Sequence, residues 1–222
     1  MKQPQHRYLG LILILVVLVA ASACVAAPRR PNSKVLLEGS WVNPYGDLAK
    51  DFTRTPDGFG ATDGLELGFR WRYYFSKTVS LAPAFHFVDY LNFKSEDPDL
   101  GAYFISVSSQ RYTLELMIVQ GAAEKKRINP FLAVSAGWFR NRATGFDKAL
   151  ITPFDETVHT VGVGVRAGVQ VGAFELSAVY NRNRFDSVRF FQPGSEIAHN
   201  WDSFAVRVGW VVPFSDGPAK KK

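Results

Sequence analysis

Strict alternation of apolar and polar residues is the feature that most constrains the fold of this chain. In residues 203–214 every second position is apolar. These positions are Phe204, Val206, Val208, Trp210, Val212 and Phe214. Successive side chains of a β-strand point to opposite faces, so this segment has one continuous apolar face and one face of small and charged residues. The pattern predicts a strand whose apolar side meets either lipid or a second sheet.

The same period of two recurs in seven more segments, so the sequence predicts eight strands. We place them at 34–43, 64–75, 78–90, 103–120, 130–140, 158–171, 173–185 and 202–214. Hydrophobic residues make up 47% of the 222 residues, yet the mean hydropathy is only −0.04. Alternation explains both values, because the two faces of each strand cancel in the average.

The connections between these segments decide between a soluble sandwich and a membrane barrel. Those after the second, fourth and sixth segments are short, whereas 44–63, 91–102, 141–157 and 186–201 are long. Strict alternation of short and long links puts all tight turns at one end, as in up-and-down barrels with periplasmic turns and extracellular loops. A Greek-key sandwich has no reason to follow this rule. The prediction is an all-β, eight-stranded antiparallel up-and-down transmembrane β-barrel over residues 34–214, with both termini on the periplasmic side.

Residues 1–23 form an expected cleavable signal peptide, which extends to residue 27 in an alternative reading. A basic start is followed by the apolar run 11–20 and by Ala21-Ser22-Ala23, which suits a signal peptidase. An uncleaved anchor is the alternative, because residues 9–27 carry no charge. Residues 24–33 are then a periplasmic lead-in, and 215–222 are a basic periplasmic tail. Cleavage before Cys24, the only cysteine, makes lipidation a second possibility at this position.

Several segments carry a family resemblance. Gly64–Phe75, Pro130–Trp138 and Val161–Tyr180 resemble the second strand, the fifth strand and the sixth-to-seventh hairpin of the small outer-membrane barrels of the OmpA, OmpX, opacity-protein and OmpW kind. The resemblance covers 33–214 and implies residence in the outer membrane of a Gram-negative cell envelope, as a monomer in contact with lipid and lipopolysaccharide. Trp210, Val212 and Phe214 resemble the end-strand signal read by the barrel-assembly machinery, although eight residues follow that last aromatic.

The inward positions of the predicted strands carry equal numbers of acids and arginines. This set is Glu38, Glu66, Glu115 and Glu175 with Arg70, Arg72, Arg166 and Arg207. An eight-stranded barrel is only wide enough for side chains to fill, and charge in a narrow bore is costly unless it is paired. We therefore predict an ion-pair network that plugs the lumen, with all but Glu66 in the periplasmic half, and with His86 as a hydrogen-bonding filler. The rival reading is a pathway for a polar solute.

Arginines at the ends of two predicted strands suggest a second site. Arg140 and Arg142 follow the fifth strand, and Arg182, Arg184 and Arg189 end the seventh strand and enter the next loop. Guanidinium groups bind phosphate in bidentate geometry, so the hypothesis is contact with the phosphates of lipopolysaccharide. A solvated basic rim is the alternative.

No motif names a catalytic, cofactor or metal site. Lipid A deacylases, which are also eight-stranded barrels, carry His and Ser two residues apart, whereas His86, His159 and His199 have no serine at that spacing. Basic residues are scattered, so no nucleic-acid site is expected. The expectation is a non-enzymatic barrel with a structural or surface-interaction role and an unidentified extracellular ligand. The alternatives are a narrow channel for small apolar molecules in the OmpW manner and a lipid-modifying enzyme.

Overall fold

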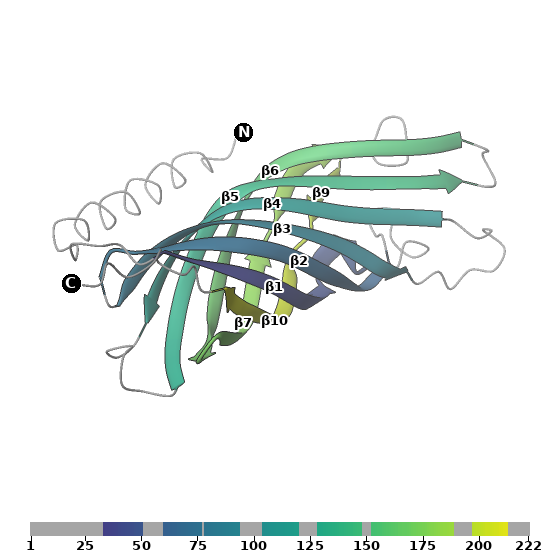
Figure 1. Ribbon diagram of the computed structural model, residues 1–222. Coiled ribbons are helices and arrows are strands. Elements are labelled where there is room, and N and C mark those ends of the chain that lie inside the picture. The colour runs from purple at the N-terminus through teal and green to yellow at the C-terminus, as the bar shows by residue number, and fades with distance from the viewer. Residues whose placement is uncertain are drawn as a thin grey trace, which may run out of the picture.

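The computed structural model describes residues 33–50, 60–76, 78–93, 104–119, 128–147, 152–188 and 197–212 (Figure 1). Eight strands form a closed antiparallel barrel in the order β1-β10-β7-β6-β5-β4-β3-β2. Their bounds are β1 Ser33–Pro44, β2 Ala61–Tyr74, β3 Val79–Phe93, β4 Phe104–Val119, β5 Ile128–Asp147, β6 Thr152–Val171, β7 Phe174–Arg182 and β10 Ser203–Val212. The predicted fold class is confirmed, and six strands lie within three residues of their predicted bounds.

The first and last strands close the barrel. The register pairs Val35 with Val212 at one end and Pro44 with Ser203 at the other, so β1 begins beside the point where β10 ends. We call this the terminal end of the barrel, and the opposite one the loop end. Gly172, with a φ of +59°, makes the tight turn between β6 and β7 at the terminal end.

The loop end contains more regular structure than the alternation indicated. β5 and β6 continue as a paired hairpin from Trp138 to Asp147 and from Thr152 to Val161, through most of the expected loop 141–157. β4 pairs with β5 as far as Phe104 opposite Phe146, so three strands project beyond their neighbours (Figure 1). A two-stranded sheet of β8 (Arg184–Val188) and β9 (Ile197–Asn200) lies where the loop 186–201 was expected. A 3₁₀ turn, η1 (Gly46–Leu48), follows β1.

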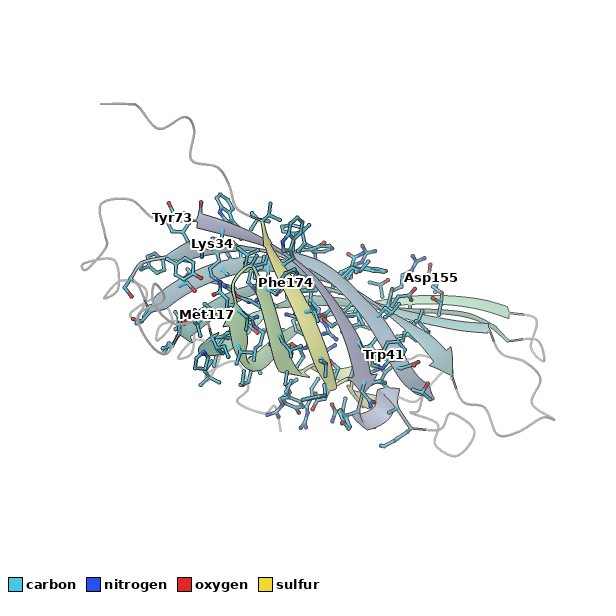
Figure 2. All side chains as sticks on the ribbon, turned by 60° about the horizontal axis from the view of Figure 1, so that its bottom comes forward. Lys34, Trp41, Tyr73, Met117, Asp155 and Phe174 are labelled. Atoms are coloured by element: carbon cyan, nitrogen blue, oxygen red, sulfur yellow. The ribbon has the colours of Figure 1, made fainter. Side chains whose placement is uncertain are left out.

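The alternation in sequence becomes an alternation in burial. β7 reads exposed-buried without exception from Phe174 to Arg182. The outward side chains are large and apolar, among them Trp41 at 52% exposed and Phe174 at 58%, both labelled in Figure 2. A continuous row of ring contacts also crosses the outer face from β2 to β6, through Phe69, Phe85, Tyr112, Trp138 and His159. Such an apolar exterior suits a lipid environment.

Gly162 lies where a larger side chain would collide with a neighbour inside the barrel. A Cβ added to Gly162 would lie 2.5 Å from the Phe139 ring, so the glycine makes room for a bulky lumenal neighbour. Within the described part of the chain, no helix has the length and apolarity needed to cross a membrane.

Candidate functional site

The barrel interior contains a layer of buried charges, which we call the charged layer. All eight acids and arginines predicted to face the lumen are buried in it, together with His86, the predicted filler, and the structure adds Arg111. The layer is Glu38, Glu66, Arg70, Arg72, His86, Arg111, Glu115, Arg166, Glu175 and Arg207, contributed by seven strands. Each is at most 5% exposed, so the network lies out of contact with bulk solvent.

Arg166 on β6 is the most connected member of the charged layer. Its Nε and Nη2 donate to the two oxygens of Glu115 at 3.0 and 2.7 Å, which is the bidentate geometry that favours arginine over lysine. Its Nη1 donates to Glu175 at 3.2 Å. The guanidinium also stacks over the Phe131 ring with its carbon 4.5 Å from the centroid. One side chain thus joins β4, β6 and β7 across the lumen.

Glu38 on β1 occupies the opposite side of the same cluster. Its Oε1 lies 3.0 Å from Nη1 of Arg70, and its Oε2 lies 2.7 Å from Nε2 of His86. Arg70 Nη2 in turn lies 3.3 Å from Glu115. Strands β1, β2, β3 and β4 are therefore cross-linked through two carboxylates.

Glu66 on β2 organises a second cluster toward the loop end. It accepts hydrogen bonds from Arg207, from Nη1 of Arg111 at 3.0 Å and from the Ser40 hydroxyl at 2.7 Å. Arg111 also donates to Tyr90 and Ser203, at 3.3 and 3.1 Å. Arg207 lies at the middle of β10, so the charged layer spans the centre of the barrel and extends beyond the half nearest the terminal end.

Arg72 and Glu175 pair across the lumen in the half toward the terminal end. Nη1 and Nη2 of Arg72 donate to the two oxygens of the Glu175 carboxylate, and Nη1 also lies 3.3 Å from the Tyr74 hydroxyl. Glu175 is shared with Arg166, so this pair is continuous with the rest of the charged layer.

Arg111 is the network member that sequence reasoning missed. It lies four residues before Glu115 on β4, so the two side chains share the inward face. The irregular stretch Ser108-Ser109-Gln110 obscured the period there, although the register opposite β5 is unbroken. Counting by twos back from Glu115 identifies it.

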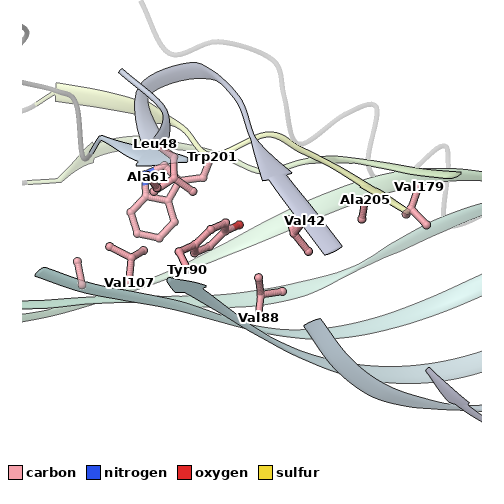
Figure 3. Packing of buried hydrophobic residues seen from close by; sticks show 10 residues of the cluster. Val42, Leu48, Ala61, Val88, Tyr90, Val107, Val179, Trp201 and Ala205 are labelled. Carbon is pink, nitrogen blue, oxygen red and sulfur yellow. The ribbon is translucent and has the colours of Figure 1, made fainter. Parts of the chain in front are cut away.

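An apolar layer lies above the charged layer, toward the loop end. It consists of Val42, Leu48, Ala61, Val88, Tyr90, Val107, Ala143, Val179, Trp201 and Ala205. Figure 3 shows Trp201 gathered with Leu48 and Ala61 beside η1. Trp201 is fully buried and its backbone N–H donates to Asn183. This layer was not predicted from the sequence, and two of its members, Leu48 and Trp201, come from expected loops.

Two aspartates hold the segments over this apolar layer. Asp47 in η1 accepts a hydrogen bond from the Asn200 backbone N–H at 2.7 Å, which ties η1 to β9. Asp202 accepts bonds from the Asn183 N–H and the Tyr180 hydroxyl at 2.9 and 2.8 Å. These bonds hold η1, β9 and the end of β7 together at the loop end, although η1 and β9 are far apart in the sequence.

The arginines predicted to bind lipopolysaccharide lie on the outside of the barrel. Arg140, Arg142, Arg182 and Arg184 are exposed, and Arg189 lies outside the described residues. Arg142 donates to both carboxylate oxygens of Asp155 across the hairpin, and Arg184 lies 3.4 Å from Asp202. The register places Arg140 opposite His159 and Arg182 opposite Val163, four residues away along β6, so the four do not form one compact cluster.

Some of the remaining predicted positions are described by the structure, and others are not. Trp210 is 47% exposed on the outer face, and Val212 ends β10. Cys24, Phe214, the signal peptide and the tail lie outside the described residues. Among the residues described, no group of three or more His, Cys, Asp or Glu side chains is arranged to hold a metal ion.

The closed eight-stranded wall, apolar outside and charged within, defines the fold of the small outer-membrane β-barrels. No protein-family model matches the chain, and no curated protein sequence matches it. Among solved structures, Neisserial surface protein A superposes with a TM-score of 0.54 at 14% identity, covering 84% of this chain and all of that one. OprG from Pseudomonas aeruginosa superposes with a TM-score of 0.47 at 14% identity, over 82% of this chain and 96% of OprG. Ail from Yersinia pestis superposes with a TM-score of 0.47 at 12% identity, over 81% of this chain and 97% of Ail.

Proposed function

We propose that this chain is an outer-membrane protein whose barrel is a sealed support for a surface-exposed loop end. The observation that carries the proposal is the filled interior: the charged layer and the apolar layer follow one another along the lumen. A solute would have to break buried ion pairs and displace packed side chains. A structural or surface-interaction role suits such a barrel better than transport does.

The apolar outer face supports placement of the barrel in a membrane. The start of β1 beside the end of β10 defines the end of the barrel that we assign to the periplasm. With the terminal end in the periplasm, the projecting strands β4, β5 and β6 stand on the outside of the cell. Assembly from the periplasm would use the end strand, through Trp210, Val212 and Phe214. Neisserial surface protein A, which shares the fold, is by its name a surface protein.

Planar-bilayer recording of the refolded chain tests the seal. We expect no steady ion current, because no continuous polar path crosses both layers. The variant Trp201→Ala, which thins only the apolar layer, should stay closed since the charged layer is intact. A large steady current from the unaltered protein would overturn the proposal.

Contact with lipopolysaccharide is the interaction that the outer arginines favour. Within the described residues, Arg140 and Arg182 are exposed and form no salt bridge, whereas Arg142 and Arg184 already lie beside Asp155 and Asp202. Replacing Arg140 and Arg182 by Gln should weaken binding of rough lipopolysaccharide more than the same change at Arg142. Unchanged binding after all of these replacements would rule out the contact.

A narrow channel for small apolar molecules is the second candidate, and the apolar layer is the observation that favours it. The charged layer beneath argues against passage through the whole lumen. Uptake of a small apolar dye into liposomes containing the barrel distinguishes the two candidates. Uptake equal to that of protein-free liposomes supports the sealed barrel.

A further inference from the structure

A small polar cavity lies inside the charged layer, bounded mostly by cationic and hydrogen-bond-donating groups. Its wall includes four arginines, Arg70, Arg111, Arg166 and Arg207, together with Asn181 and one carboxylate, Glu115, which Arg166 already binds through both oxygens. The space is on the scale of a single water molecule. It is therefore too small for an organic ligand and suits one small ion or one water.

The charge around this cavity does not balance. Among the described residues, the charged layer holds five arginines and four glutamates, counted without His86. Arginine keeps its proton in proteins, and each of these glutamates faces at least one arginine. The layer therefore carries a net charge of +1, in a place where an uncompensated charge is costly.

The hydrogen bonds are unbalanced in the same direction. Within the described residues, Nε of Arg70, Nε of Arg111 and Nδ2 of Asn181 are buried without an acceptor. All three side chains line the cavity and are at most 5% exposed. Each of these three atoms is a donor. Oε1 of Glu38, a carboxylate oxygen of the charged layer that also has no hydrogen bond, is outside the cavity wall and 3.0 Å from Arg70. A water molecule accepts two hydrogen bonds and must itself donate two, whereas a halide only accepts.

We propose that this cavity binds one small monovalent anion of the size of chloride, enclosed when the barrel folds. The anion accepts hydrogen bonds from the orphaned donors and cancels the excess positive charge. The site thereby completes the charged layer, as an internal counterion rather than a transported solute. This inference is independent of the surface role proposed above.

Refolding in different salts tests the site. The full chain is refolded in detergent micelles in sodium chloride or in sodium gluconate, whose anion is too large for the cavity, at the same ionic strength. The midpoint of thermal unfolding should be a few degrees higher in chloride. Asn181→Ala should abolish that difference, while Asn141→Ala, the same change at a buried asparagine outside the cavity wall, should keep it.

Diffraction gives a readout that does not depend on any variant folding. Crystals of the unaltered chain refolded in sodium bromide should show an anomalous peak between Arg70, Arg111 and Asn181. A water-like density without anomalous signal, or equal unfolding midpoints in the two salts, would show that water fills the cavity and would overturn the proposal.

Discussion

At the scale of single residues, the interior shows why arginine rather than lysine serves in the charged layer. Arg166 makes hydrogen bonds to two glutamates and stacks on Phe131 at the same time. A lysine has one compact charge and no plane to stack. The role of such a residue is to satisfy several buried carboxylates at once, beside Arg70 and Arg72, each of which also contacts one of these carboxylates.

Arg166→Ala should therefore be strongly destabilising, because it leaves the buried Glu115 carboxylate with only the longer contact to Arg70. Loss of one partner of a buried pair costs about 3–5 kcal/mol. Arg142→Ala is the matched control, since the Arg142–Asp155 pair is exposed and contributes little. Urea unfolding in lipid vesicles measures both, and equal stabilities of the two variants would contradict the assigned role of Arg166.

Sequence periodicity located the charged layer but not its full membership. A period of two fixes which face a side chain occupies, and it placed Glu38 and Arg207 inside although 169 positions separate them. It did not reveal Arg111, which sits behind an irregular stretch. It also did not reveal that Leu48 and Trp201 complete the apolar layer, because these two side chains reach the lumen from connections rather than from strands.

At the scale of elements, the β5–β6 hairpin is where sequence and structure differ most. Strand prediction relied on a continuous apolar outer face, and beyond Trp138 the outward positions of β5 are polar, as at Arg140 and Arg142. Residues 141–147 were therefore predicted as part of a loop, although their backbone ladder is continuous. The inward Ala143 is nevertheless buried in the apolar layer. Backbone hydrogen bonds can continue where the outward side chains are polar, so an apolar–polar pattern does not reveal this part of the strand.

The hairpin tip should be removable without loss of the barrel. Deleting residues 145–154 and joining Thr144 to Asp155 through Asn-Gly keeps the lower ladder and offers a turn suited to hairpins. We expect the shortened protein to refold with unchanged heat-modifiable migration on gels. Failure to form the barrel would show that the projecting strands are needed for folding.

A titration reports on the pair within the hairpin. Arg142 donates to Asp155, and this hydrogen bond holds the pKa of that carboxyl below its ordinary value. The interaction is thus present at neutral pH and is lost as the pH falls through the lowered pKa. Carboxyl NMR should show the Asp155 pKa rising in Arg142→Gln. An unshifted value would mean that the pair does not persist in solution.

At the scale of the whole molecule, ion pairs across the lumen connect strands that are not adjacent in the barrel wall, such as β2 and β7. Glu38, Glu66, Glu115 and Glu175 connect β1, β2, β4 and β7 to arginines on other strands. We expect unfolding to be cooperative, with tryptophan fluorescence and gel migration changing together. Separate transitions for the two measurements would indicate that the charged layer and the wall come apart independently.

In the orientation proposed above, with the loop end outside the cell, the length of β5 and β6 has a consequence for what the cell presents to its surroundings. From Trp138 to Asp147 the chain advances nine residues, or roughly 30 Å at the usual rise of a strand. A stalk of this height, braced by β4, would carry its tip above the sugars nearest the bilayer. Antibodies and host molecules too bulky to reach the barrel rim would then meet this chain first at its tip.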